Sequence, residues 1–467
     1  MTPSGAATVR SHTLTSISQT NHQDTPDLAG LRVLVFGLGR FGGGLGVTRW
    51  LVRTGASVTV TDRADGDQLS ESLAEIGDLD LDLRLGGHDP ADLSAIDLVV
   101  VNPAVRKAES DLFQEIVRRD VPWTTEMNLF CERCGAPIVA VTGSYGKSTT
   151  CAMLADALTT GVVAKRIEYT GVHLGGNIGG SLLTDLPNIK PTDLVVLEMS
   201  DAQLEDVPRI RWAPKIAVIT NLSPHHLDRY NSYGEYISAK LNVIGAPPHA
   251  DTVVAGDLDA ETETALARAL SEKAERIIRI EKPEPAVELR VPGRHNLDNA
   301  ACVLSVCRLL SLDETIARSA LAEFKGLPHR LEFVRTIEGV DYYNDSKSTA
   351  PAATVKAIAS FDRPIVAIVG GQRKDVPLDD WANALTQSCH TIICTGESGK
   401  VFGDALRQAG DSRSIQEANS LADALHSAKT AAQPGDIVLF SPGAPSFDNY
   451  PNFVARGLHF VELVNGL

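Results

Sequence analysis

The sequence predicts an α/β protein made of parallel sheets covered by helices. Short apolar runs, each with the length of a buried strand, alternate along the chain with stretches of helical apolar spacing, and this alternation is typical of parallel sheets. Three of these runs end in glycine turns, before Gly37, Gly143 and Gly370. The 467 residues suggest about three domains, at roughly 150 residues each. We therefore expect three α/β units, each opened by one of the glycine turns.

The expected strands are the apolar runs. In chain order they are Arg32 to Phe36, Ser57 to Thr61, Leu98 to Val101, Ile138 to Val141, Leu194 to Leu197, Ile216 to Thr220, Ile365 to Val369, Thr391 to Cys394 and Ile437 to Phe440. One domain boundary is expected near Glu126, where a helix ends before the next strand, and another at the Gly/Pro break 326–328, after the helical stretch 296–324. The predicted domains are 28–125, 126–326 and 327–467, after a disordered tail, 1–27, rich in Ser, Thr, Gln and Asn.

Charge and cysteine content exclude several classes of protein. The net charge is -16 and no Lys/Arg block occurs, which argues against binding to nucleic acid or to an anionic membrane. The seven cysteines are odd in number and mostly lie in apolar runs, so we expect reduced core thiols. Cys131 and Cys134 form one CxxC without a second CxxC or a nearby His pair, so a zinc or redox site is not expected. No apolar run approaches the ~20 residues of a membrane span, and we expect a cytoplasmic protein without membrane insertion.

The strand-turn-helix segment 137–158 carries the strongest nucleotide signal. A buried-strand run stops at the turn Gly-Ser-Tyr-Gly-Lys-Ser, and helical spacing follows. The glycines let backbone N–H groups approach an anion, and the helix that begins near Lys147 points its positive end at that anion. Ser148 offers a hydroxyl to Mg²⁺. Because Val141 stands where the full P-loop pattern has glycine, the segment is a shorter form that by itself predicts only a nucleotide ligand.

A second glycine motif favours a different nucleotide. Gly37-Leu-Gly-Arg-Phe-Gly42 follows a strand, and Asp62 ends the next strand at the distance, about 20 residues, expected of a ribose-binding carboxylate. Taken alone, this motif indicates a dehydrogenase. Hydride transfer has no use for a triphosphate cradle, so the two motifs together favour a ligase that binds a nucleotide-linked substrate on a Rossmann-like domain. A tight turn without any ligand stays open as the structural alternative.

Motifs further along the chain resemble those of the Mur ligases. They are Gly175-Gly-Asn-Ile-Gly179, Leu197-Glu-Met-Ser200, Thr220-Asn-Leu-Ser-Pro-His-His-Leu-Asp-Arg-Tyr230, Ala239-Lys240, His295-Asn296, Gly326-Leu-Pro-His-Arg330, Tyr343-Asn-Asp-Ser-Lys-Ser-Thr349, Ser441-Pro-Gly-Ala-Pro-Ser-Phe-Asp448 and Arg456-Gly457. They follow in the family's order and spacing over about residues 28–467, which chance does not explain. The later motifs are similar to those of the members that add D-glutamate.

This resemblance implies a fold and an activity. It implies a Rossmann-like N-terminal domain for a UDP-linked substrate, a central P-loop ATPase domain with a parallel sheet, and a Rossmann-like C-terminal domain for an amino acid. The implied enzyme is an ATP-dependent, amide-forming ligase that adds D-glutamate to UDP-N-acetylmuramoyl-L-alanine through an acyl phosphate, in peptidoglycan synthesis. ATP and Mg²⁺ at two sites are the implied cofactors, and a monomer is expected. The chemistry agrees, because a carboxylate acylates poorly until one of its oxygens becomes a leaving group.

The resemblance assigns the roles of the family's site residues to the matching positions of this sequence. The phosphates of ATP and the first Mg²⁺ would be held by Gly143, Ser144, Gly146, Lys147, Ser148 and Thr149, and the second Mg²⁺ by Glu198, His226 and a carbamylated Lys240. The remaining ATP contacts would come from Asn299, Arg330 and Asp345, with Lys347 on the γ-phosphate. D-glutamate would meet Thr349, Lys374, Ser446 and Phe453, and the UDP part Leu38, Gly39, Arg40, Thr61, Arg63, Asn102 and Asn177. Taken singly, most of these residues could equally be turn formers or solvated surface residues.

Four departures from the family pattern stand close to these positions. Tyr145 replaces a small residue inside the P-loop, and its phenol must either turn outward or narrow the approach to the phosphates. The pair Asp201-Ala202 stands where the family usually has Ser-Phe, which adds a carboxylate near the second Mg²⁺. His225 replaces a usual acidic residue, and Ala350-Pro351 replaces an Asn beside the D-glutamate threonine. The lysines and glutamates of the chemical core remain, so we expect an active ligase whose amino-acid pocket is the least determined part.

Three alternatives stay open. One is a related ATP-dependent amino-acid ligase, either another Mur ligase or an enzyme like folylpolyglutamate synthase. The second is an NAD-dependent oxidoreductase that uses the Gly37–Gly42 motif. The third is a catalytically inactive binding protein, which only the substitutions at Tyr145, Asp201 and Ala202 suggest.

Overall fold

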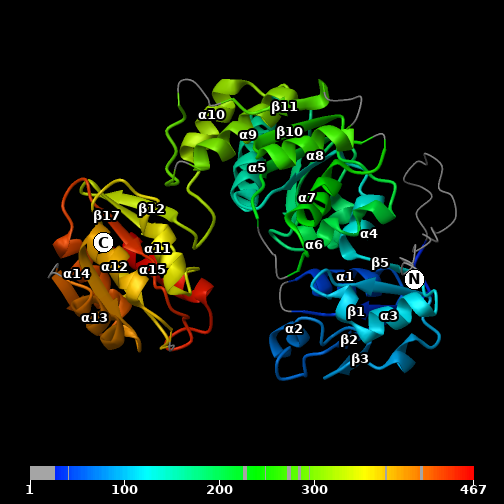
Figure 1. Ribbon diagram of the computed structural model, residues 1–467, viewed down its shortest axis with the longest axis horizontal. Helices are drawn as coiled ribbons and strands as arrows, with labels where there is room; N and C mark the ends of the chain where they lie inside the picture. Colours follow the sequence, from blue (N-terminus) through cyan, green and yellow to red (C-terminus); the bar gives the residue numbers. More distant parts are fainter. Residues whose placement is uncertain are drawn as a thin grey trace, which may run out of the picture. The chain divides into compact units, whose positions relative to one another are not determined.

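The structure is a computed structural model that describes residues 27–39, 42–224, 229–247, 249–270, 275–281, 286–293, 295–373, 376–410 and 414–467. Arg40, His225, His226 and Lys374 lie outside the described residues, as does the predicted tail apart from Asp27. The chain forms two compact units: Met1–Glu281 with Ala301–Ala317, and Lys282–Ala300 with Arg318–Leu467. The helices and strands of both units are labelled in Figure 1.

The first sheet is parallel throughout, in the order β3-β2-β1-β4-β5. Its elements are β1 Arg32–Phe36, α1 Gly43–Arg53, β2 Ser57–Asp62, α2 Ser70–Ala74, β3 Asp82–Leu85, β4 Leu98–Val101, α3 Asp111–Arg118 and β5 Trp123–Thr124. Alternate residues of β1 are buried on opposite faces: Val33 shares a core cluster with residues of α1, and Leu34 shares another with residues of α3. The strand order reverses between β1 and β4, so Gly37 and Asn102, which follow these strands, lie at the switch point where such sheets bind ligands.

The second sheet, also parallel, lies in the same unit, in the order β11-β10-β9-β6-β8-β7. Its elements are α4 Glu126–Arg133, β6 Ile138–Thr142, α5 Lys147–Val163, β7 Val172–Gly176, β8 Leu194–Glu198, α6 Asp201–Leu204, β9 Ile216–Asn221, α7 Tyr233–Leu241, β10 Thr252–Asp257, α8 Ala260–Leu270 and β11 Ile277–Arg279. After β6 the chain builds β7 and β8 on one side of it and then β9 on the other. The carboxyl end of β6 is therefore a second switch point, and the glycine turn at Gly143 begins there.

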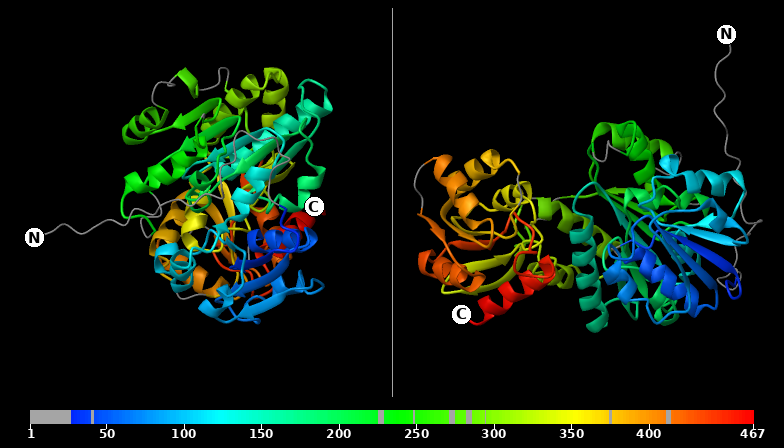
Figure 2. Two further views of the ribbon diagram at one scale, coloured as in Figure 1. Left: turned by 90° about the vertical axis from the view of Figure 1, so that its right-hand side faces the viewer. Right: turned by 90° about the horizontal axis from the view of Figure 1, so that it is seen from below.

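The third sheet belongs to the other unit and has the order β12-β13-β17-β14-β15-β16. Its elements are β12 Glu332–Ile337, β13 Val340–Asn344, α11 Pro351–Ile358, β14 Ile365–Gly370, α12 Asp379–Ser388, β15 Cys389–Thr395, α13 Gly399–Gln408, β16 Ser414–Glu417, α14 Leu421–Ala431, β17 Ile437–Phe440 and α15 Phe453–Asn465. The edge pair β12–β13 is antiparallel, and the other pairs are parallel. Core residues of α12 and α13 cluster on one face and those of α14 and α15 on the other, and these helices can be followed in Figure 2. The switch point lies between β17 and β14.

The nine strands expected from apolar runs are all confirmed, with ends within two residues of the expected ones. The sequence missed the six edge strands, β3, β5, β7, β11, β12 and β16, and also β10 and β13. Edge strands are buried on fewer sides, so β3 carries the mostly exposed sequence Asp-Leu-Arg-Leu in place of an apolar run. The pattern that reveals a central strand is therefore weak at the edges.

Two helix predictions are corrected by the structure. The helix expected to end near Glu126 in fact begins there as α4, and the Thr125 side chain caps it by accepting a hydrogen bond from Asn128 N at 3.2 Å. The helical stretch 296–324 is two helices, α9 His295–Leu309 and α10 Glu314–Glu323.

All seven cysteines are buried, as expected of core thiols. Among the described residues, no helix is both long and apolar enough to cross a membrane.

Candidate active site

The turn after β6 is shaped by two glycines. Gly143 has φ +154°, and a Cβ added to it would lie only 2.1 Å from Thr220 Oγ1. Gly146 caps α5 in the left-handed region, with φ 78°. The turn therefore runs against the end of β9 and leads into the N-terminus of α5, the end of a helix that favours an anion. This is the strand-turn-helix context that the phosphate-binding motif requires.

Polar groups from β9 and α7 hold the turn in place. The Asn221 side chain forms two hydrogen bonds with the backbone of Tyr145. Its Oδ1 accepts from Tyr145 N at 3.0 Å, and its Nδ2 donates to Tyr145 O at 3.0 Å. Ser144 Oγ lies 3.0 Å from Tyr236 OH. Lys147 Nζ donates to two carbonyl oxygens of the turn, at 3.0 and 3.2 Å. Tyr145 itself is 53% exposed, so its phenol takes the outward of the two orientations that the sequence left open.

Glu198 ends β8 beside this turn and is fully buried. It pairs in register with Val141 of β6. Its Oε1 accepts from Asn177 Nδ2 at 2.8 Å, but its Oε2 has no hydrogen-bond partner among the described residues. An unpartnered buried carboxylate oxygen is costly, and a hard divalent cation would satisfy it. The residues present therefore fit Mg²⁺ at this place.

Lys240 lies on α7 with its side chain 1% exposed. Its Nζ donates to Thr142 Oγ1 at 3.3 Å and forms an ion pair with Asp201 Oδ1 at 3.4 Å. Burial, followed by the charge of Lys147, lowers the pKa of Lys240 to about 8, while Asp201 opposes the shift. Tyr230 OH lies 3.0 Å from Asp201 Oδ2. The sequence marked Asp201 as a departure, but nothing in it revealed that the new carboxylate pairs with Lys240.

The first sheet places its two predicted polar residues against its own backbone. Asp62 Oδ2 accepts from Gly39 N at 3.0 Å, and Oδ1 accepts from Ala64 N at 2.9 Å. Asn102 Nδ2 donates to Gly37 O at 3.1 Å. Oδ2 of Asp62 thus holds the glycine turn and Oδ1 holds the backbone just after β2, which is the role of the tight-turn alternative and leaves the expected ribose contact without structural support.

The other residues expected at the UDP part differ in exposure. Leu38 is fully buried in the core, so only its backbone can face a ligand, whereas Arg63 is exposed. Thr61 Oγ1 lies 2.9 Å from His88 Nδ1. Asn177, expected here as well, lies against Glu198 at the second sheet. The residues carried over for this substrate are therefore divided between two sheets of one unit.

In the C-terminal unit, Asp345 follows β13 and is buried. It accepts from Ser348 Oγ at 2.5 Å and from Ser441 Oγ at 2.8 Å, and burial raises its pKa to about 6. Asn299 is buried and donates to Asn296 Oδ1 at 2.9 Å. Arg330 is exposed.

The residues expected around D-glutamate lie on the loops after β13 and β17 and at the start of α15. Lys347, which was expected on the γ-phosphate of ATP, lies near one of them, with its Nζ 5.8 Å from the centre of the Phe453 ring. Ser446 is buried, and Thr349 is exposed. Lys347 and Phe453 thus lie close together. Ser446 and Thr349 lie on loops at the same edge of the sheet.

Arg456 is a residue of this region whose role the sequence did not assign. It is buried on α15 and donates to Ser346 O at 2.9 Å, Ala444 O at 3.0 Å and Pro445 O at 3.1 Å. It therefore ties the loop after β13 to the loop after β17, the two loops that carry Lys347 and Ser446. The sequence signal that could have identified Arg456 is its place in the Arg456-Gly457 motif.

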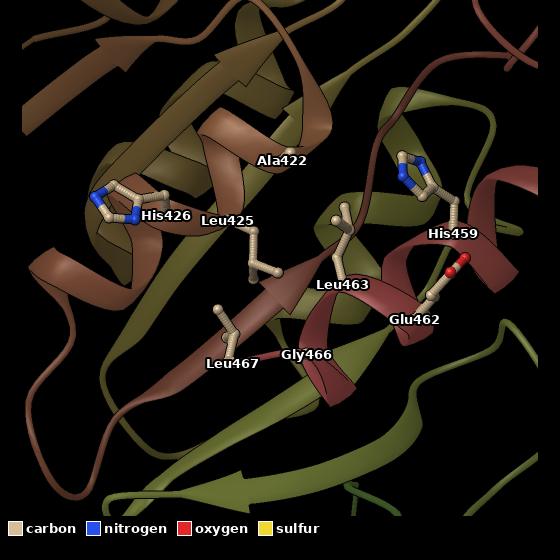
Figure 3. A pocket seen from close by; sticks show the side chains of 8 residues that line it. All are labelled: Ala422, Leu425, His426, His459, Glu462, Leu463, Gly466 and Leu467. Atoms are coloured by element: carbon tan, nitrogen blue, oxygen red, sulfur yellow. The ribbon is translucent and has the colours of Figure 1, made fainter.

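A hollow of about 490 Å³ lies elsewhere, between α14 and α15. Leu425 and Leu463 line its middle, and His426 and His459 stand on either side in Figure 3. None of the predicted site residues lines it. It offers no phosphate-binding turn and takes no part in the site.

Comparison with known proteins gives matches along most of the chain. The Mur ligase MurD-like N-terminal domain matches residues 31–123, the Mur ligase middle domain residues 141–286, and the Mur ligase glutamate ligase domain residues 329–443. A UDP-N-acetylmuramoylalanine--D-glutamate ligase of Symbiobacterium thermophilum is 33% identical, over 93% of this chain and 98% of its own. The enzyme of that name from Geotalea uraniireducens is 34% identical, over 94% and 98%.

Solved structures show the same fold at lower identity. The UDP-N-acetylmuramate-alanine ligase MurC of Thermotoga maritima superimposes with a TM-score of 0.51 at 20% identity, over 93% of this chain and 99% of its own. A UDP-N-acetylmuramoyl-L-alanyl-D-glutamate--2,6-diaminopimelate ligase gives a TM-score of 0.54 at 16% identity, over 93% and 92%. These likenesses support the three-domain α/β architecture with parallel sheets.

Proposed function

The chain belongs to the Mur ligase family, and we propose that within it the chain is an ATP-dependent ligase that adds D-glutamate to UDP-N-acetylmuramoyl-L-alanine. Relatives named for this activity match nearly the whole chain at about a third identity. The structural observation that carries the proposal is the buried oxygen of Glu198 beside the phosphate-binding turn, which has no hydrogen-bond partner within the described part of the chain. The reaction belongs to the synthesis of peptidoglycan precursors, which takes place in the cytoplasm.

The reaction joins a carboxylate to an amine in two balanced steps. The carboxylate of the UDP-linked substrate attacks the γ-phosphorus of ATP, which forms an acyl phosphate and releases ADP. The amine of D-glutamate then attacks the acyl carbon, the amide bond forms, and phosphate and a proton leave. Such phosphoryl transfer needs positioned positive charge more than covalent help from the protein.

The chain's own residues supply that positioning. The turn 143–146 and the N-terminus of α5 would cradle the phosphates, with Lys147 on the β- and γ-phosphates and Thr149 beside them. Lys347, Asn299, Arg330 and Asp345 would complete the ATP contacts. Thr349, Ser446 and Phe453, together with Lys374 outside the described residues, would hold D-glutamate.

Mg²⁺ is the cofactor that fits the acidic part of the site, where it would neutralise charge on the phosphates. We propose two positions for it, one at Ser148 and one at Glu198, with His226 outside the described residues. The resemblance assigns the remaining anion of the second position to a carbamate on Lys240, a buried amine whose pKa is lowered to about 8. The carboxylate of Asp201 is a second candidate for that anion.

The division into domains 28–125, 126–326 and 327–467 remains our proposal for this enzyme. We assign the first to the UDP-linked substrate through Gly39, Arg40, Thr61, Arg63 and Asn102, with Leu38 contributing backbone and Asn177 reaching in from the second sheet. A monomer is the proposed state.

The test is release of phosphate by the purified chain with ATP, Mg²⁺, UDP-N-acetylmuramoyl-L-alanine and a panel of amino acids. We expect release with D-glutamate and formation of the amide product. Release with a different amino acid and none with D-glutamate would assign the chain to a related ligase of the same superfamily. The oxidoreductase alternative finds no support, since the two oxygens of Asp62 accept from the backbone of Gly39 and of Ala64, and NADH should not bind in a fluorescence titration.

A further inference from the structure

Arg229, in the segment between β9 and α7, connects the two sheets of the first unit. Its Nη1 and Nη2 both donate to Pro103 O, in the turn after β4, at 3.4 Å. Its Nε and Nη2 donate to the two carboxylate oxygens of Glu205, each at 2.9 Å. We propose that Arg229 is a positioning residue: held by Glu205, it fixes the turn 102–105 for binding of the UDP-linked substrate. This role rests on the proposed function, which places that substrate on the first sheet.

The turn 102–105 follows β4 at the switch point of the first sheet. Asn102 organises the turn from within, because its Oδ1 accepts from Ala104 N at 2.9 Å and its O accepts from Val105 N at 3.0 Å. Asn102 Nδ2 also donates to Gly37 O at 3.1 Å, which joins the turn to the glycine turn after β1. These three bonds lie within the first sheet's part of the chain, so they do not set the place of the turn relative to the second sheet.

The guanidinium of Arg229 is itself held in one orientation. The side chains of Arg229 and Glu205 are 19% and 26% exposed. Although burial opposes it, hydrogen bonds from Arg229 and Tyr230 and the charges of Arg229 and Lys107 lower the pKa of Glu205, so its carboxylate is an anion. Two N–H···O bonds to one carboxylate fix the plane of a guanidinium as well as its place. The bonds to Pro103 O are long, and their direction is set by this pair with Glu205.

An ion pair holds the same part of the chain a little further on. Lys107, shortly after Pro103, has its Nζ 2.7 Å from Asp206 Oδ2 and 3.5 Å from Glu205 Oε2. Both carboxylates directly follow α6, which belongs to the second sheet. The residues from 103 to 107 are therefore held at both ends by groups of the second sheet. Arg229 holds the end that adjoins the ligand turn.

Such a link matters for a substrate that must reach from one sheet to the other. In the proposed reaction the UDP part binds near Asn102, and the carboxylate at the other end of the same molecule meets the phosphates at the turn after β6. A misplacement of about 1 Å between reacting groups can reduce a rate by ~100-fold. Arg229 acts on this distance through Pro103, by fixing where the substrate is held.

The first experiment measures Michaelis constants by phosphate release from the natural chain and from Arg229→Lys. The lysine keeps the positive charge but has no planar fork to serve Glu205 and Pro103 O together. We expect the KM for the UDP-linked substrate to rise at least ~10-fold and the KM for ATP to stay within about twofold. Equal rises in both constants, a rise for ATP alone or no rise in either would overturn the proposal.

Arg279→Lys is the matched control for this measurement. Arg279, on the edge strand β11, also donates to both oxygens of a glutamate, Glu263, at 3.2 and 2.6 Å. Neither constant should change in this variant. A rise in the KM for the UDP-linked substrate as large as that in Arg229→Lys would overturn the proposal, because loss of any such pair would then have the same effect.

The second experiment measures amide hydrogen exchange by mass spectrometry, without substrates. In Arg229→Lys, the amides of Ala104 and Val105 should exchange at least ~5-fold faster than in the natural chain, because the turn opens more often. The amides of β4 should keep their protection. Unchanged exchange in the turn would overturn the proposal. Loss of protection throughout β4 would also overturn it, because Arg229 would then hold the sheet and not the turn.

The two experiments separate this role from the proposed function. If the natural chain releases no phosphate with D-glutamate while exchange in the turn 102–105 changes as expected, the proposed function fails and the hold of Arg229 on the turn stands. If phosphate is released with D-glutamate while Arg229→Lys leaves both Michaelis constants unchanged, the proposed function stands and the role of Arg229 fails.

Discussion

At the scale of one residue, the buried carboxylate of Glu198 lowers the stability of the protein and at the same time prepares the site for a cation. One carboxylate oxygen is satisfied by Asn177, and the other is buried without a partner among the described residues. Such a group lowers the stability of the ligand-free protein. A cation with phosphate ligands would remove that cost when ATP binds, so the unfavourable group contributes to nucleotide affinity.

The substitution Glu198→Gln tests this. The amide keeps the shape and the contact with Asn177 but loses the charge, so we expect phosphate release to fall at least ~100-fold. The melting temperature without ligands should stay the same or rise, because the buried charge is gone. Glu261→Gln, on the exposed face of α8, serves as the control and should change neither quantity. A large loss of thermal stability in Glu198→Gln would show that the carboxylate is structural.

At the scale of elements, the turn between β6 and α5 depends on the absence of a side chain at one position. Thr220 Oγ1 donates to Tyr145 O at 2.7 Å and occupies the space that a Cβ on Gly143 would need. The turn, β9 and α7 therefore form one packed arrangement.

Gly143→Ala should disrupt that arrangement. Because the new Cβ would lie 2.1 Å from Thr220 Oγ1, the turn must move, and we expect the KM for ATP to rise at least ~10-fold. Gly234→Ala, in α7, is the matched control: its Cβ meets its nearest neighbour at an ordinary 3.8 Å, and alanine should stabilise the helix by roughly 0.5 kcal/mol. An unchanged KM in Gly143→Ala would refute the packing argument. Steady-state kinetics and thermal melting give the two readouts.

Helix α4 begins with a buried acid. Glu126 accepts from Ser181 Oγ at 2.6 Å, and burial raises its pKa from the ordinary 4.5 to about 7. A carboxyl whose pKa is raised by folding favours the folded state when protonated. That contribution is complete below pH 4.5 and is lost as the pH rises to about 7.

Glu126→Gln removes this dependence while it keeps an acceptor for Ser181. We expect the free energy of unfolding of the variant, relative to the natural chain, to increase across that pH window by at most roughly 3 kcal/mol and to stay level above it. Urea denaturation at pH values on both sides of the window measures the difference. Glu71→Gln, on the surface of α2, should show no such change. A difference that is constant with pH would contradict the assigned pKa.

At the scale of the whole molecule, the three sheets share one structural feature. Each sheet reverses its strand order next to a glycine turn, after β1, β6 and β14. The family resemblance assigns most residues of the UDP part to the first sheet, the phosphates of ATP to the turn after β6 in the second, and D-glutamate to loops of the third. Each ligand should therefore stabilise the protein through contacts of its own.

Thermal shift measurements test this separation. At about 100 times its dissociation constant, ADP should add about 2.7 kcal/mol of stability, and removal of Mg²⁺ with a chelator should reduce the effect. Lys147→Ala should lose the shift caused by ADP and keep the shift caused by the UDP-linked substrate. Loss of both shifts would show that the two ligands share this lysine.

Much of the fold was predictable, because central parallel strands are buried on both faces and appear as continuous apolar runs. The strands 138–142 and 437–440 are of this kind. The edge strands and the start of α4 were missed or misplaced, since local sequence does not show which strand lies outermost. At the site, Lys147 was expected from the local motif and Glu198 and Lys240 from the family resemblance, whereas Arg456 and Tyr236 act through contacts between distant segments.

The sequence by itself determined the fold class, the phosphate-binding turn and the family, because each depends on residue types at fixed local spacing. Only the tertiary structure decided which groups meet: Asp62 with its own glycine turn, Asn177 with Glu198, and Asp201 with Lys240. Residues 201 and 240 come from different helices, and their distance follows from how those helices pack on the sheet. The charge balance at the centre of the site is therefore a property of the folded chain.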